Sequence, residues 1–101
     1  MFLMIVMAQL VTIPAAASTV ETGKVLADQL CSRCHAIETA GDSPHPDAPP
    51  FRTIHRLYPV DSLAEALAEG IVTGHPDMPE FKFQPDDVGN LIDYLISIQV
   101  R

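Results

Sequence analysis

The segment Cys31-Ser32-Arg33-Cys34-His35 decides how the rest of this chain is interpreted. Two cysteines three positions apart lie about one helical turn from each other, so both thiols can reach one flat molecule. The order C-x-x-C-H is the attachment signature of c-type haem, in which each thiol bonds one vinyl group and the adjacent histidine ligates the iron. We therefore expect Cys31 and Cys34 to bind haem covalently and His35 to be an axial ligand.

Three other uses of the two cysteines fit the sequence less well. A C-x-x-C redox pair normally belongs to a βαβ unit, and no segment here has the pattern of a strand. A structural zinc site needs four ligands, and Cys31 and Cys34 with two histidines match no zinc-finger spacing. A disulfide between Cys31 and Cys34 would close a small, strained ring that stabilises little.

Length and charge narrow the class of protein. The chain has 101 residues, 6 Lys and Arg against 13 Asp and Glu, and a formal net charge of −7. This length allows one small domain, and the acidic balance argues against nucleic acid, because little would neutralise the phosphates. No catalytic triad or carboxylate dyad stands out, so we expect no enzyme and no catalytic residue.

Residues 1–17 have the pattern of a secretory signal peptide. They hold no charge, are mainly apolar as far as Ile13, and end in Pro14-Ala15-Ala16-Ala17, which fits the small-x-small cleavage rule. No Lys or Arg precedes the apolar stretch, which departs from the usual pattern. We expect residues 18–101 to be released into the periplasm. The alternative is an uncleaved anchor, although the stretch is shorter than the ~20 residues that span a bilayer.

The hydrophobic pattern predicts an all-α domain. Apolar residues recur every three or four positions in three segments, and no segment sustains the alternation of a β-strand. The three predicted helices are residues 19–36, 62–71 and 85–99. Two of them begin with a capping box, Ser18 to Glu21 and Ser62 to Glu65.

Two proline-rich loops, residues 37–60 and 72–84, join these helices. Long loops in a small domain usually serve a function, and we expect both to wrap one haem. The second loop holds Met78, the only methionine after residue 17. Because His and Met together are typical ligands of electron-transfer haems, Met78 is the predicted sixth ligand. The alternative ligands are His75, His55 and His45.

These features resemble class I cytochrome c over residues 18–101, and the small bacterial periplasmic members in particular. The resemblance rests on Cys31-x-x-Cys34-His35, on Asp77-Met78-Pro79, and on the final helix. It implies the cytochrome c fold, one covalently attached haem c with its iron, and one-electron transfer.

The resemblance also implies two structural contacts. The first and last helices should cross at Gly23 and Tyr94, and the proximal histidine should donate its N–H to a proline carbonyl. Pro49 and Pro50 are equally good candidates for that carbonyl. Three further residues are candidates either for contact with the haem propionates or for plain surface positions, namely Arg52, Arg56 and Tyr58.

The predicted function is that of a soluble single-haem carrier that shuttles one electron between redox partner proteins. With a net charge of −7, it should prefer a partner with a basic or apolar docking patch. Two alternatives remain open. The first is a haem sensor or peroxidase-like domain with a weak sixth ligand, and the second is a tightly bound subunit of a periplasmic dehydrogenase.

Overall fold

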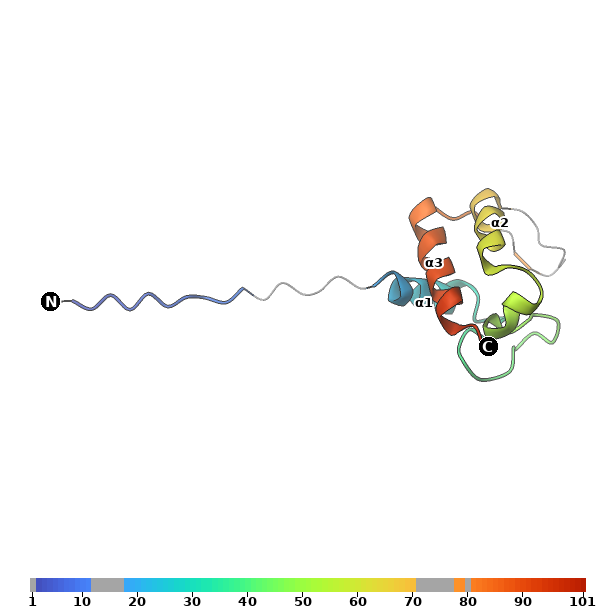
Figure 1. Cartoon of the computed structure of the whole chain (residues 1–101), viewed down its shortest axis with the longest axis horizontal. Helices are drawn as coiled ribbons and strands as arrows, with labels where there is room; N and C mark the ends of the chain where they lie inside the picture. Colours follow the sequence, from blue (N-terminus) through green and yellow to red (C-terminus); the bar gives the residue numbers. More distant parts are fainter. Residues whose placement is uncertain (1, 12–17, 71–77, 80) are drawn as a thin grey trace.

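The computed structural model describes residues 2–11, 18–70, 78–79 and 81–101. Its elements are α1 (Thr19–Leu30), the 3₁₀ helices η1 (Phe51–Arg56) and η2 (Val60–Ser62), α2 (Leu63–Glu69) and α3 (Pro85–Ile98). No β-strand occurs in these described ranges, and the all-α prediction is confirmed. In Figure 1, α3 lies between α1 and α2 and contacts both.

Residues 2–11 form no helix, and all of their side chains are exposed. None of the helices within the described ranges has the length and apolar character needed to cross a membrane.

The first helix ends earlier than its hydrophobic pattern predicts. It stops at Leu30 rather than continuing to Ala36, because the backbone N–H groups of Cys31 and Ser32 both bond to the Ala27 carbonyl. Because two N–H groups share one carbonyl, the regular hydrogen-bond pattern of the α-helix stops here. The chain then continues through consecutive turns. The start of α1 is as predicted, since Ser18 Oγ accepts the Glu21 N–H at 3.1 Å.

The second helix is also shorter than predicted. Ser62 makes no side-chain cap because it ends η2 and already has helical backbone angles, so the predicted capping box with Glu65 is wrong. Gly70 ends α2 with φ of 74°, a left-handed conformation that favours glycine. The third helix agrees with the prediction to within one residue at its end.

The crossing of α1 and α3 depends on a glycine. A Cβ atom built on Gly23 would lie 1.9 Å from the carbonyl oxygen of Asn90 and 2.8 Å from Cβ of Tyr94. Both are closer than any non-bonded contact, so the two backbones meet where only glycine fits. The crossing at Gly23 and Tyr94 is confirmed.

Tyr94 fastens this crossing to the loop that follows the cysteine motif. Its ring is 4% exposed, and its hydroxyl donates to the carbonyl of Ile37 at 2.6 Å. Burial, with a smaller contribution from the charge of Glu38, raises the pKa of the Tyr94 phenol. A side chain of α3 therefore fixes the position of Ile37, two residues after His35.

The buried side chains form one cluster around α3. Its members on α3 include the apolar stripe predicted from the sequence, Val88, Leu91, Leu95 and Ile98. Ala27 of α1 and Phe51 and Ile54 of η1 pack against the same cluster. The core thus joins the two ends of the domain to η1, a 3₁₀ helix that forms within the first proline-rich loop.

We predict that Gly23→Ala lowers the free energy of unfolding by about 1–3 kcal/mol, the usual cost of overpacking a tight contact. Gly89→Ala is the matched control, because a Cβ there meets nothing within 4 Å. It should raise helix stability by about 0.5–1 kcal/mol. Urea denaturation of the holoprotein measures both values, and equal effects of the two substitutions would contradict the close contact.

We predict that Tyr94→Phe costs about 1–3 kcal/mol, because the buried Ile37 carbonyl loses its donor. A pKa raised in the folded state adds stability that is complete below the unfolded pKa of about 10 and is lost as pH rises through the folded pKa. The wild type should therefore lose stability above about pH 10, and Tyr94→Phe should lose less. Urea denaturation against pH tests this, with Tyr58→Phe as a control that retains the alkaline loss.

Candidate functional site

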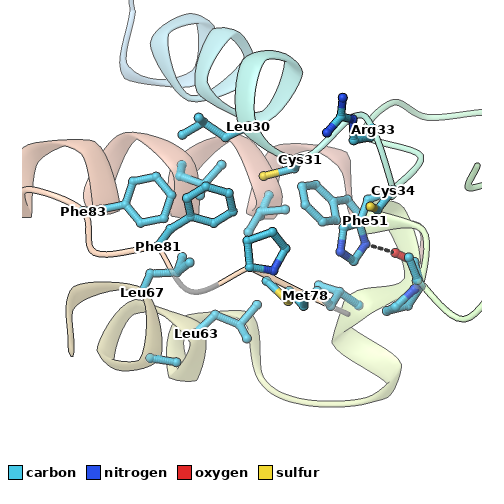
Figure 2. Close-up of a pocket in the computed structure, with 18 of the residues that line it drawn as sticks. Leu30, Cys31, Arg33, Cys34, Phe51, Leu63, Leu67, Met78, Phe81 and Phe83 are labelled. Carbon is cyan, nitrogen blue, oxygen red and sulfur yellow. Dashed lines mark hydrogen bonds between the residues drawn. The ribbon is translucent and has the colours of Figure 1, made fainter. Parts of the chain in front are cut away.

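A cavity of about 510 Å³ lies between the end of α1, η1, α2 and α3. Its walls are mainly apolar, with Leu63 and Leu67 of α2 facing Phe81 and Phe83 in Figure 2. Cavities of roughly 300–1,000 Å³ hold small ligands and cofactors. The four predicted site residues, Cys31, Cys34, His35 and Met78, all line it.

The turns after α1 bring the motif to one wall of this cavity. The backbone N–H groups of Cys34 and His35 both bond to the carbonyl of Cys31, at 3.2 and 2.9 Å. This single turn places both thiols and the imidazole beside the same space (Figure 2). The arrangement needs no continuous helix through the motif, although the sequence pattern predicts one.

The two cysteines are separate thiols and form no disulfide. Burial, together with the neighbouring Cys34, raises the pKa of the Cys31 thiol to about 11. Redox-active C-x-x-C pairs instead have a thiolate of lowered pKa. Both the disulfide and the redox-pair alternatives are therefore disfavoured.

The ring of His35 is fixed by a hydrogen bond. Its Nδ1 lies 2.8 Å from the carbonyl oxygen of Pro49, drawn as the dashed line in Figure 2. Because a carbonyl only accepts, Nδ1 carries the hydrogen and Nε2 carries the lone pair. Such a bond orients an imidazole ligand and raises its basicity. The structure thus selects Pro49 rather than Pro50 as the partner.

The segment that supplies this carbonyl is itself held against the motif. The Phe51 N–H bonds to the Ala36 carbonyl at 2.9 Å. The Phe51 ring lies 4.7 Å from the His35 ring between centroids, with 39° between the planes. The carbonyl and the ring of two nearly adjacent residues therefore constrain the same imidazole.

Met78 lines the cavity from the segment between α2 and α3 (Figure 2). Of the histidines considered as alternative ligands, His45 also lines the cavity. His55 is exposed and bonds to Gln99 instead, and His75 lies outside the described residues. Among the candidates within the described residues, Met78 and His45 are the two that line the cavity.

The residues suggested for the haem propionates separate in the structure. Tyr58 lines the cavity, whereas Arg52 donates to the Gly41 carbonyl at 2.7 Å and Arg56 is not among the lining residues. Arg33, inside the C-x-x-C motif, does line it. Sequence reasoning did not single out Arg33, although its place between the two cysteines was a usable signal.

Three aromatic residues of the cavity were also missed. Phe51 packs on the imidazole, and Phe81 and Phe83 lie 5.8 Å apart between ring centroids. All three lie outside the α-helices, so the periodic pattern of apolar residues in the predicted helices did not include them.

The residues present fit a haem. Its flat, apolar macrocycle matches the apolar walls, its two vinyl groups match the paired thiols, and its iron needs the oriented imidazole that Pro49 provides. In contrast, no three His, Cys, Asp or Glu side chains within the described ranges are grouped to hold a metal ion directly.

Comparison with known proteins agrees with this fit. No curated protein and no solved structure matches the chain. The sequence model of the family described as Cytochrome c, in contrast, matches residues 20–99, which include all of α1 but its first residue, the motif, the cavity walls and α3. The chain therefore belongs to the cytochrome c family, whose members bind covalently attached haem c with its iron.

Proposed function

We propose that this protein is a single-haem electron carrier. In this proposal Cys31 and Cys34 would hold the haem through two thioethers, and His35 and Met78 would ligate its iron. The observation that carries the proposal is that the oriented imidazole, the two thiols and Met78 line one apolar cavity. Membership of the cytochrome c family supports haem binding and electron transfer in general.

When bound, haem c supplies a one-electron Fe(III)/Fe(II) couple. The chain's own residues set the conditions for it. Leu67, Phe81 and Phe83 exclude water from one side of the cavity, and the Pro49 carbonyl fixes the face that the imidazole presents. None of these roles transfers a proton or forms a covalent intermediate, and we propose a carrier without enzymatic activity, as is general in the family.

We also propose that residues 1–17 are a signal peptide and that residues 18–101 act in the periplasm. The apolar sequence of the first segment supports this, as does a family match that begins only at residue 20. Covalent attachment of haem c outside the cytoplasm requires such export. The intact mass of the exported protein reports both cleavage after Ala17 and the added haem, and a mass that retains residues 1–17 would refute the cleavage.

We predict that Met78→Ala removes the near-infrared Met-to-iron band of the ferric protein. It should also lower the reduction potential, because a Met ligand raises the potential of a haem. Axial ligands set haem potentials over a range of about 0.8 V. Optical spectra and redox titration measure these two effects.

His45→Ala is the matched control for Met78→Ala, since His45 lines the same cavity, and it should retain the band. Absence of the band from the wild type, or a band that is kept in Met78→Ala, would contradict ligation by Met78. A high-spin ferric wild type that binds CO readily would favour the sensor function instead.

We propose that the redox partner presents a basic or apolar docking patch. The net charge of −7 supports this, because opposite charges steer encounter and salt screens that attraction.

We predict that electron transfer with such a partner slows as ionic strength rises from about 0.01 to 1 M, over which the Debye length falls from about 30 to 3 Å. Stopped-flow rates test this, with a neutral small-molecule reductant as the control. A partner rate that is flat or rises with salt would refute the proposed steering.

A further inference from the structure

The side chain of Gln99 forms a complete set of hydrogen bonds at the end of α3. Its Oε1 accepts the backbone N–H of His55 at 2.9 Å and the ring Nδ1–H of the same residue at 2.8 Å. Its Nε2 donates to the carbonyls of Phe51 at 2.6 Å and Leu95 at 2.8 Å. A primary amide has two donors and two acceptor sites, and all of them are used.

Only one orientation of this amide satisfies its neighbours. If the oxygen and nitrogen were exchanged, the NH₂ group would face the His55 N–H, and the oxygen would face the carbonyls of Phe51 and Leu95. Both faces would then pair like with like. Gln99 therefore acts as a specific connector between the last turn of α3 and both ends of η1. Figure 1 shows the C-terminus lying beside this 3₁₀ helix.

The first residue of η1 is the residue that packs on the axial imidazole. Gln99 holds the Phe51 carbonyl, the Phe51 ring contacts the His35 ring, and the carbonyl two residues earlier accepts the His35 Nδ1–H. The same short segment thus joins the Gln99 amide near the C-terminus to the His35 ring.

We propose that Gln99 is a positioning residue for the axial histidine: it fixes η1 so that the Pro49 carbonyl and the Phe51 ring hold the His35 imidazole at the iron. This inference rests on the proposed function, because it takes His35 to be an iron ligand. Loss of the connector lets η1 move and weakens the bond from Nδ1 to the Pro49 carbonyl. A weaker bond makes the imidazole less basic, so Fe(III) is stabilised less and the reduction potential rises.

The experiment compares wild type with Gln99→Leu and Gln99→Met, all as holoproteins. Both substitutions remove the amide without adding charge near the iron. The backbone bond from Val100 to the Arg52 carbonyl, at 2.9 Å, remains and keeps the C-terminus on η1. Ser97→Ala is the matched control, because it removes a 2.6 Å bond at the same end of α3 that does not reach η1.

We expect both Gln99 variants to shift the one-electron equilibrium toward Fe(II) by about threefold, which is about 28 mV at 59 mV per tenfold change. In the reduced proteins, NMR should show faster solvent exchange of the His35 Nδ1–H. Ser97→Ala should change neither quantity, even where its unfolding midpoint falls.

An unchanged potential and unchanged Nδ1–H exchange in a folded Gln99 variant would overturn the inference and leave Gln99 a purely structural residue. The inference is equally overturned if Ser97→Ala shifts both quantities as far as the Gln99 variants do. Failure of the proposed function is seen separately, because the wild-type ferric spectrum would then lack the signature of His and Met ligation before any variant is compared.

Discussion

The hydrogen bond from the His35 imidazole to the Pro49 carbonyl is the constraint around which the rest of this structure is arranged. It ties the turn that carries both thiols to Pro49, in the middle of the first proline-rich loop. The loop between them is held by the Tyr94 hydroxyl at Ile37 and by Arg52 at Gly41. A long segment without regular structure is thereby given one shape, and the orientation of the imidazole at the cavity is fixed.

The cavity is completed by elements that are weak on their own. The helix α2 has no fully buried residue, and its Leu63 and Leu67, which pack against the core cluster, also line the cavity. A small domain buries too little apolar surface to be very stable without an added staple. Haem c would be that staple, because it would fill the cavity that α2, η1 and Phe83 line.

Much of the fold was readable from the sequence because local chemistry and tertiary packing agree there. The apolar stripe of α3, the Ser18 cap and the close approach at Gly23 each depend on residue types that have few other uses. Two local predictions were wrong for related reasons. The apolar pattern of a helix continues past Cys31, but the N–H groups of Cys31 and Ser32 both bond to the Ala27 carbonyl and the helix ends. At Ser62 the sequence has a capping pattern, but a preceding 3₁₀ turn already gives this residue helical backbone angles.

The candidate site was only partly readable. The residues of the motif and Met78 are marked by their types and spacing, and the cavity brings them together. The choice of Pro49 over Pro50 depends on where one carbonyl points, which composition does not encode. The connector Gln99 carried no signal at all, because a glutamine after an apolar stripe is ordinary until its four partners are seen.

The contact at Gly23 has a consequence for how the chain acquires its structure. It joins the first helix to Asn90 and Tyr94 in the last one, so the main packing contact of α1 forms only after almost the whole polypeptide has been synthesised. Contacts between residues so far apart in sequence slow folding. The pairing of the two terminal helices therefore waits until α3 has been synthesised.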